Sequence, residues 1–141
     1  MKVTKLYLDM DGVLCNFEKR FTELYGEDAL GFRDRKNFTT NWPNFIMDGN
    51  FENLEWFPGG KELLEFIQNE TDWDVEILSS SGGELYHTEV KAQKLQWLKE
   101  HNITYPPNIT AGSRKKSLYA SHGRILVDDT DYVIRDFITC G

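Results

Sequence analysis

The sequence predicts an α/β fold in which a parallel β-sheet lies between two layers of helices, with a small insertion after the first strand and helix. Three observations predict this fold. Short apolar runs alternate with amphipathic segments, several of these runs stop abruptly at polar residues, and 141 residues suffice for one compact domain. In such sheets, ligands bind beyond the carboxyl ends of the strands. A functional site is therefore expected there.

The first half of the chain contains two regular stretches and then an irregular one. Residues 3–8 are an apolar, β-prone run that ends at Asp9, and residues 17–25 suit a helix. Residues 26–57 lack a clear period, which is typical of an insertion. Their aromatic residues include Phe32, Phe38, Trp42, Phe45, Phe51 and Trp56.

The second half alternates regularly between helix and strand. After Pro58-Gly59-Gly60, a helix is predicted from the spacing of Leu63, Leu64 and Ile67. The later elements are a strand over 73–78, a helix over 87–101 with Val90, Leu95 and Leu98 inward, a strand over 108–111, a short helix over 113–120, a strand over 124–127 and a helix over 132–138.

Composition excludes several classes of protein. The net charge of −7 argues against non-specific coating of nucleic acid, which needs a basic face. No apolar run approaches the roughly 18 residues of a membrane span, and no signal-peptide pattern is present, so a soluble, cytoplasmic protein is expected. Cys15 and Cys140 lack the spacing of a disulfide scaffold or a zinc site.

Polar residues converge at the ends of the predicted strands. Asp9 and Asp11 follow the first strand, Ser79 follows the second, Lys116 follows the third, and Asp128 and Asp129 follow the fourth. Crowded carboxylates repel one another unless a cation neutralises them, and an all-oxygen cluster suits Mg²⁺. The sequence therefore predicts a magnesium site at this edge of the sheet.

This set of side chains suits phosphoryl transfer. A carboxylate such as Asp9 can attack phosphorus, and Asp11, two residues on, can protonate the leaving oxygen and later activate water. A phosphoryl group also needs a hydroxyl and an ammonium for its oxygens. Ser79, Ser80 and Lys116 can supply these groups.

Four segments resemble, in order, the four motifs of the haloacid dehalogenase (HAD) superfamily: residues 6–13 (LYLDMDGV), 77–79 (ILS), Lys116, and 125–129 (ILVDD). The resemblance implies that Asp9 is a nucleophile and metal ligand and that Asp11 is the general acid/base, with its backbone carbonyl on the metal. It implies that Asp129 is a direct ligand and that Asp128 supports the metal through water. Dehalogenase members lack the second aspartate of the first motif, so Asp11 favours a phosphatase.

Within that superfamily, the chain is similar to the 5′(3′)-deoxyribonucleotidases. The residues that carry this likeness are 9–14 (DMDGVL) with Asn16-Phe17, 50–55 leading into Pro58-Gly59, and Ser79-Ser80. The likeness implies a catalytic core of residues 1–16 and 58–141 and a small cap of residues 17–57, with Phe17 packing on a nucleobase. The substrate it implies is a nucleoside monophosphate. The family usually has Thr at position 79, often has Pro at position 81, and continues into a further strand after the fourth motif.

Simpler interpretations compete at each position. The Asp-x-Asp-Gly segment suits a plain turn, Asp128-Asp129 suits a helix N-cap, and cap aromatics are more often core than ligand platform. Arg114 and Lys115 compete with Lys116 for the role of the third-motif cation. The histidines, His87, His101 and His122, lack ligand or triad spacing, and Cys15 suits a small buried apolar residue.

Two other functions stay open beside that of a nucleotidase. One is removal of terminal 3′-phosphates from nucleic-acid ends. The other is non-catalytic binding of phosphate or metal. The choice of base and sugar and the oligomeric state leave no signal in the sequence.

Overall fold

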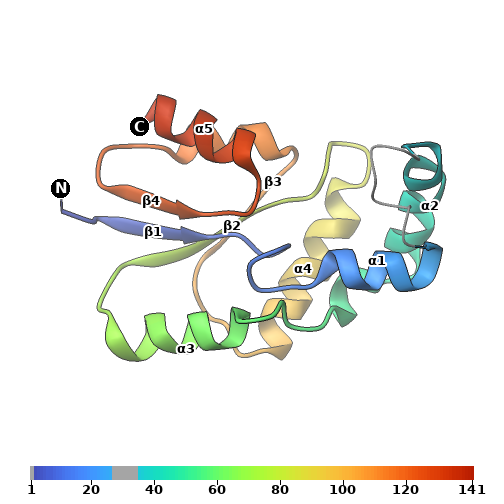
Figure 1. Ribbon diagram of the computed structural model, residues 1–141, viewed down its shortest axis with the longest axis horizontal. Coiled ribbons are helices and arrows are strands. Elements are labelled where there is room, and N and C mark those ends of the chain that lie inside the picture. Colours follow the sequence, from blue (N-terminus) through green and yellow to red (C-terminus); the bar gives the residue numbers. More distant parts are fainter. Residues whose placement is uncertain (1, 27–34) are drawn as a thin grey trace.

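The computed structural model describes residues 2–26 and 35–141, so Phe32 and part of the predicted cap lie outside the described residues. Helices and strands alternate along the chain (Figure 1). The elements are β1 (Lys5–Leu8), α1 (Phe17–Tyr25), α2 (Arg35–Met47), η2 (Asn50–Asn53), α3 (Gly60–Glu70), β2 (Val75–Ser80), α4 (His87–Glu100), β3 (Pro107–Thr110), η3 (Ser113–Tyr119), β4 (Arg124–Val127) and α5 (Asp131–Cys140).

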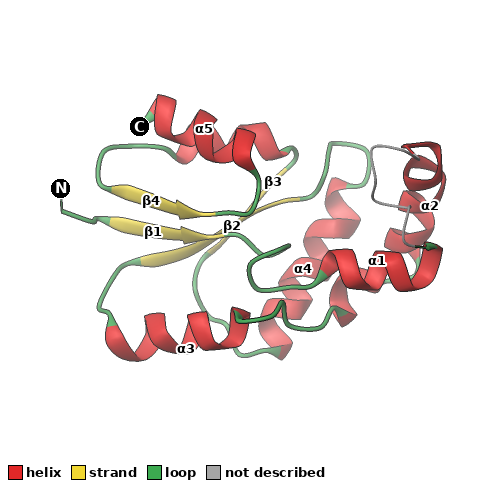
Figure 2. Cartoon of the chain, in the orientation of Figure 1, coloured by secondary structure: helices red, strands yellow, loops and turns green. Residues whose placement is uncertain are grey.

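The four strands form one parallel sheet in the order β3-β2-β1-β4. The short helix α5 lies on one side of this sheet and α3 lies on the other (Figure 2). Because all strands run in the same direction, β1, β2 and β4 deliver their carboxyl ends to one edge. The predicted fold class, a parallel sheet between helical layers, is confirmed.

Each strand sends alternate side chains to the two faces, as the pleat requires. On one face Leu6 and Leu8 of β1 join Ile77 of β2 in the main hydrophobic core, together with residues of α3 and α4. On the other face Tyr7 and Leu78 pack against Phe137 of α5. Burial on both faces explains why the strands read as nearly continuous apolar runs.

The segment between β1 and α3 contributes to the same core. Phe21, Phe45 and Phe51 are buried in one cluster with the sheet residues. Helix α2 was not predicted, because it contains Pro43 and its buried residues Phe45 and Ile46 are adjacent and show no helical period. The division into a core and a cap over residues 17–57 stays a prediction.

The second strand lies about two residues later than predicted. Trp73 is exposed and precedes β2, whereas Ser79 and Ser80 belong to it, because they pair with Ile109 and Thr110 of β3. Pairing with β3 therefore fixes Ser79 in a strand and not in the loop that follows. Among the described helices, none is both long and apolar enough to cross a membrane.

Candidate active site

Asp9 lies at the floor of the site, directly after β1, and is only 5% exposed. Its Oδ1 accepts hydrogen bonds from the Met10 backbone N–H (2.8 Å) and pairs with the Lys116 ammonium (3.1 Å). No described residue donates a hydrogen bond to Oδ2. Burial raises the pKa of Asp9 to about 7, the Lys116 charge opposes the rise, and the Asp128 carboxylate adds to it. Asp9 Oδ1 is thus held by two contacts, whereas Oδ2 has no hydrogen-bond donor among the described residues.

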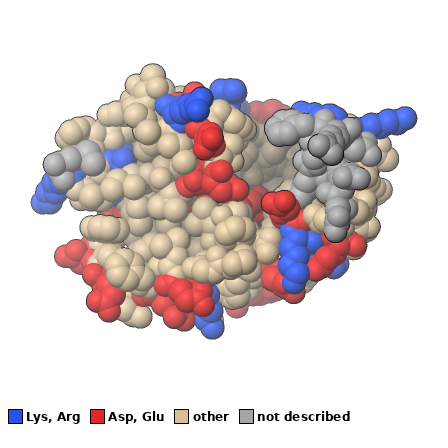
Figure 3. All heavy atoms as spheres, viewed as in Figure 1, with Lys and Arg blue, Asp and Glu red and all other residues tan. Residues whose placement is uncertain are grey.

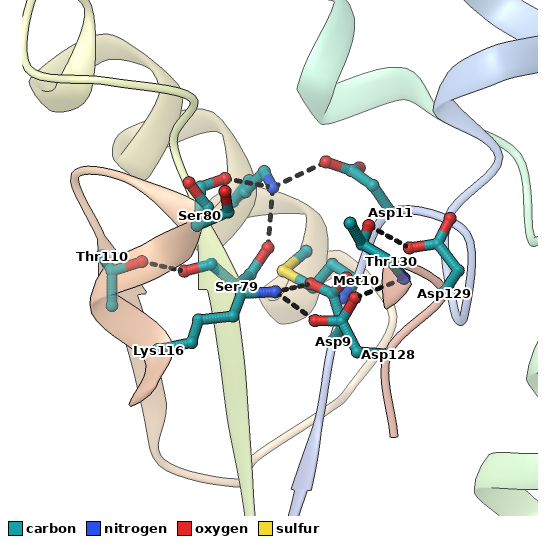
Figure 4. A network of polar contacts seen from close by, with 12 residues as sticks. Asp9, Met10, Asp11, Ser79, Ser80, Thr110, Lys116, Asp128, Asp129 and Thr130 are labelled. Atoms are coloured by element: carbon teal, nitrogen blue, oxygen red, sulfur yellow. Dashed lines mark hydrogen bonds and ion pairs between the residues drawn. The ribbon is translucent and has the colours of Figure 1, made fainter. Parts of the chain in front are cut away.

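Lys116 joins the first and last predicted motifs. Its Nζ lies 2.6 Å from Asp128 Oδ2 as well as near Asp9, and its side chain is nearly buried (Figure 4). Burial lowers the pKa of Lys116, but the two carboxylates more than offset this effect, so the pKa is raised and the ammonium stays charged. Asp128 Oδ1 accepts from the Thr130 N–H at 2.9 Å, so both Asp128 oxygens are engaged.

Three carboxylates form a candidate cation site. Asp9, Asp128 and Asp129 each offer an oxygen, and these oxygens lie within 4.8 Å of one another. Burial raises the pKa of Asp129, and the Asp128 charge raises it further. Charge crowding of this kind is relieved by a bound cation. The donor set, all oxygen and acidic, fits a hard divalent ion.

The turn after Asp9 brings Asp11 and Gly12 to the same place. The N–H groups of Val13, Leu14 and Cys15 all donate to the Met10 carbonyl, which closes a tight turn. Gly12 has φ +79°, in the region that glycine adopts without strain. The turn interpretation of the Asp-x-Asp-Gly segment is therefore true of its backbone, and the same turn places its two aspartates at the site.

A second lysine, Lys94 of α4, connects Asp11 with β2. Its Nζ lies 2.8 Å from Asp11 Oδ2, 2.7 Å from Ser79 Oγ and 2.8 Å from the Ser80 carbonyl. Lys94 is 1% exposed and also lies over the Phe51 ring, at 5.3 Å from its centroid. The Asp11 carboxylate, the Ser79 hydroxyl and the Ser80 backbone carbonyl therefore converge on one ammonium (Figure 4).

Sequence reasoning missed Lys94 because Gln93-Lys94 resembles an exposed polar pair on a helix. A signal was nevertheless present. The buried residues of α4 include Val90, Gln93, Lys94, Trp97 and Leu98, which follow the i, i+3, i+4, i+7, i+8 spacing of an inward face. Leu95, predicted inward, is only partly buried beside this face. Charged residues on an apolar stripe are rarely buried without a partner.

A cavity of about 750 Å³ opens above these groups. The predicted residues that line it include Asp9, Asp11, Phe17, Ser79, Ser80, Lys116 and Asp129. Asp and Glu side chains are spread over the face that Figure 3 shows, and some of them lie between the α5 layer and the helices α1 and α2. The volume of the cavity suits a small molecule.

Aromatic side chains form one wall of the cavity. Phe17, Phe38 and Trp42 line it, and the Phe38 and Trp42 rings stack at 5.4 Å. Phe17 also stacks on the buried Phe51, at 5.6 Å, so it belongs to both the wall and the core. Two other aromatic residues of the insertion, Phe45 and Phe51, are fully buried, as the core interpretation expects.

Several of the remaining candidate residues have partners other than the carboxylates of the site. Arg114 pairs with Asp136 and Lys115 with Glu84, both at the surface, so Lys116 is the cation of the three that reaches the site. His101 packs on Trp97, and His87 hydrogen-bonds Ser81. Cys15 is buried.

Comparison with known proteins places the fold. The chain matches no protein-family model and no curated protein sequence. Among solved structures it resembles a haloacid dehalogenase-like hydrolase from Burkholderia xenovorans LB400, with 12% identity and a TM-score of 0.55, over 99% of this chain and 78% of that one. At this identity the likeness concerns the fold. The chain therefore has a haloacid dehalogenase-like α/β fold.

Proposed function

We propose that the protein is a Mg²⁺-dependent phosphatase that hydrolyses a phosphate monoester through a phosphorylated Asp9. The observation that carries the proposal is the state of the Asp9 carboxylate. It lies at the floor of a cavity with Oδ1 held by Met10 and Lys116, and it has Oδ2 free of hydrogen bonds from the described residues. A nucleophile needs this combination of fixed orientation and an available oxygen. The HAD-like fold supports hydrolase chemistry at this edge of the sheet.

In the first step an Asp9 oxygen attacks phosphorus, and the bond from phosphorus to the leaving oxygen breaks. Asp11 donates the proton that the leaving oxygen needs. Its Oδ1 has no hydrogen-bond partner among the described residues, so no existing hydrogen bond has to break before this transfer. The products are an alcohol and an aspartyl-phosphate.

In the second step water attacks the aspartyl-phosphate. Asp11, now ionised, takes one proton from that water, and the bond between Asp9 and phosphorus breaks to release inorganic phosphate. Asp9 is then a free carboxylate again, and Asp11 is again protonated. Each residue therefore returns to its starting state after one turnover.

Two groups are placed to bind the phosphoryl oxygens. Lys116 has three N–H donors, of which Asp9 and Asp128 accept two, so one remains for the cavity that Lys116 lines. Ser79 is also among the residues that line the cavity, and its hydroxyl can donate a hydrogen bond. Donors fixed in this way stabilise charge that develops during transfer.

A divalent cation fits the residues present. The charged residues that line the cavity are Asp9, Asp11, Glu18, Asp129 and Lys116, so the described part of the wall is acidic. A phosphate dianion would be repelled there without a cation. Asp9 and Asp129, with the Asp11 backbone carbonyl, would hold Mg²⁺, and Asp128 would support it through water. When bound, the ion supplies positive charge to the phosphoryl oxygens.

The aromatic wall supports a nucleoside monophosphate as substrate. Phe17, Phe38 and Trp42 offer flat surfaces, and stacking of a base on such rings is worth about 1–3 kcal/mol. The cavity of about 750 Å³ has room for one nucleotide. These features favour a nucleotidase, and the sequence similarity to the 5′(3′)-deoxyribonucleotidases is the reason that we propose this family.

The test is a panel of substrates assayed with Mg²⁺ and with a chelator. We expect Mg²⁺-dependent hydrolysis of p-nitrophenyl phosphate and, with higher kcat/KM, of a deoxynucleoside monophosphate. Asp9→Asn should abolish both activities while binding of Mg²⁺ or phosphate is partly kept. A 3′-phosphorylated oligonucleotide as the best substrate would instead establish nucleic-acid end processing. Binding of phosphate without hydrolysis of any substrate would establish a binding module.

A further inference from the structure

Lys94 is a buried cation that the proposed phosphatase steps do not use. Its ammonium contacts both Asp11 and Ser79, which lie 68 residues apart in the sequence. Lys94 is 1% exposed, and burial of a lysine is costly unless its charge is paired and its donors are used. A residue kept at that cost requires an explanation.

We propose that Lys94 is a positioning residue that holds the Asp11 carboxylate and the Ser79 hydroxyl in register for phosphoryl transfer. This inference rests on the proposed function, in which Asp11 shuttles the proton and Ser79 binds the phosphoryl group. Lys94 binds Asp11 through Oδ2 at 2.8 Å and leaves Oδ1 without a partner among the described residues. The contact of Oδ2 with Lys94 thus fixes the orientation of the carboxyl group and leaves Oδ1 to transfer the proton.

The same contact sets the direction of the Ser79 hydroxyl. Because Lys94 donates to Ser79 Oγ at 2.7 Å, the oxygen acts as an acceptor on that side. The hydroxyl proton of Ser79 is then free to point into the cavity, where a phosphoryl oxygen accepts it. One ammonium therefore orients both the proton donor for the leaving group and a donor for the transferred group.

Direct binding of phosphate by Lys94 does not fit its contacts. An ammonium has three N–H groups, and Asp11 Oδ2, Ser79 Oγ and the Ser80 carbonyl accept all three. Lys94 is also not among the residues that line the cavity, whereas Lys116 is. The two lysines thus have different roles: Lys116 faces the substrate and Lys94 supports the residues that do.

Helix α4 is anchored tightly enough for this task. The neighbouring Gln93 accepts from the Phe51 N–H at 3.1 Å and donates to the Ile46 carbonyl at 2.7 Å. One turn later, the Trp97 indole donates to the Leu54 carbonyl at 2.8 Å. These bonds fix the helix against the inserted segment, so the Lys94 ammonium has a defined position.

The test compares Lys94→Met, Asp11→Asn and the double variant on two substrates with Mg²⁺ present. The nitrophenolate of p-nitrophenyl phosphate leaves without a proton, whereas the alkoxide of a nucleoside monophosphate needs one. Since kcat/KM reports the steps up to the departure of the leaving group, we expect Lys94→Met to lower it about 10–100-fold for the nucleotide. The loss for the aryl phosphate should be several-fold smaller. Lys91→Met, at an exposed position on the same helix, is the matched control.

A second comparison separates positioning from a general structural role. If Lys94 acts through Asp11, the double variant should hydrolyse the nucleotide no more slowly than Asp11→Asn alone, because the two changes remove one function. Lys94→Arg should recover part of the activity because it keeps the charge. If Lys94→Met does not fold, as judged by circular dichroism, Lys94→Gln carries the same comparison.

The outcomes are distinguishable. Equal loss on both substrates, or a raised KM with unchanged kcat, would overturn the inference in favour of a structural or phosphate-binding role. In that case Asp11→Asn would still discriminate between the leaving groups, and the proposed function would stand. If the wild-type protein hydrolyses neither substrate, the proposed function fails, and the inference fails with it.

Discussion

Gly12 and Asp129 approach so closely that a Cβ atom at residue 12 would lie 2.0 Å from Asp129 Oδ2. Gly12 also has φ +79°, which side chains other than glycine adopt with strain. The first turn of the chain and the last predicted motif thus fit together only because residue 12 has no side chain. This contact fixes where the Asp129 carboxylate can lie.

Gly12→Ala should therefore displace the Asp129 carboxylate and weaken cation binding. We expect the affinity for Mg²⁺, measured by isothermal titration calorimetry, to fall roughly 10–100-fold, as for other changes beside a metal ligand. Gly112→Ala is the control, since its φ is ordinary and, apart from its two chain neighbours, no described residue has an atom within 4 Å of the new Cβ. Unchanged affinity in Gly12→Ala would show that Asp129 does not bind the metal.

The raised pKa of Asp9 predicts how stability depends on pH in the absence of metal. The folded-state pKa of about 7 lies above the unfolded value of about 3.9. Protonation of Asp9 therefore favours the folded state, and this stabilisation is complete below a pH of about 3.9. The stabilisation by this protonation decreases as the pH rises from about 3.9 to about 7 and is absent above that. In a chelator, Asp9→Asn should raise the Tm at pH 8 by roughly 2–5 °C, with a smaller difference at pH 5.

The control for this comparison is Asp72→Asn, which removes an exposed carboxylate. That variant should follow the wild-type curve at both pH values. An Asp9→Asn variant that is less stable than the wild type at pH 8 would show that the Asp9 charge is favourable in the metal-free fold.

Activity should depend on Mg²⁺, and Ca²⁺ should be a poor substitute. Ca²⁺ takes more ligands at longer distances, which would misplace the attacking carboxylate. Replacing Mg²⁺ by Ca²⁺ should lower kcat for p-nitrophenyl phosphate by about 10-fold or more, a loss of roughly 1.4 kcal/mol in transition-state stabilisation. Full activity after exhaustive chelation would contradict a metal-dependent mechanism.

Phe17→Ala should raise KM for a deoxynucleoside monophosphate by about 10-fold, because loss of stacking is worth about 1–3 kcal/mol. Hydrolysis of p-nitrophenyl phosphate should change little, since the carboxylates and Lys116 are untouched. Phe66→Ala, at an exposed position on α3, is the control. Equal losses on both substrates would mean that Phe17 serves only the core that it forms with Phe45 and Phe51.

Much of the site could be predicted because most of its residues lie at the carboxyl ends of the strands. A parallel sheet brings all carboxyl ends to one edge, so Asp9, Asp128 and Ser79 could be placed together without knowing any distance. Lys116 is brought there by η3, and it is buried while its neighbour Lys115 is exposed. The sequence order of the elements was enough for these residues.

The rest depends on packing that has no local signature. Lys94 lies in the middle of a helix, and only its partners Asp11 and Ser79, distant in sequence, make its burial favourable. Helix α2 is stabilised by aromatic contacts with α1, such as Phe38 with Phe21, despite Pro43 within it. The end of β2 is set by pairing with β3. In each case tertiary contacts override local propensity.

Trapping of the phosphorylated intermediate tests the central claim most directly. During turnover of p-nitrophenyl phosphate with Mg²⁺, sodium borohydride should reduce an acyl phosphate at Asp9 to the alcohol, homoserine. Mass spectrometry of the peptide that carries residue 9 reads the change. The account predicts homoserine at residue 9 in the wild type and none in Asp9→Asn or without substrate. Steady release of phosphate with residue 9 unmodified, or modification at Asp11 instead, would contradict it.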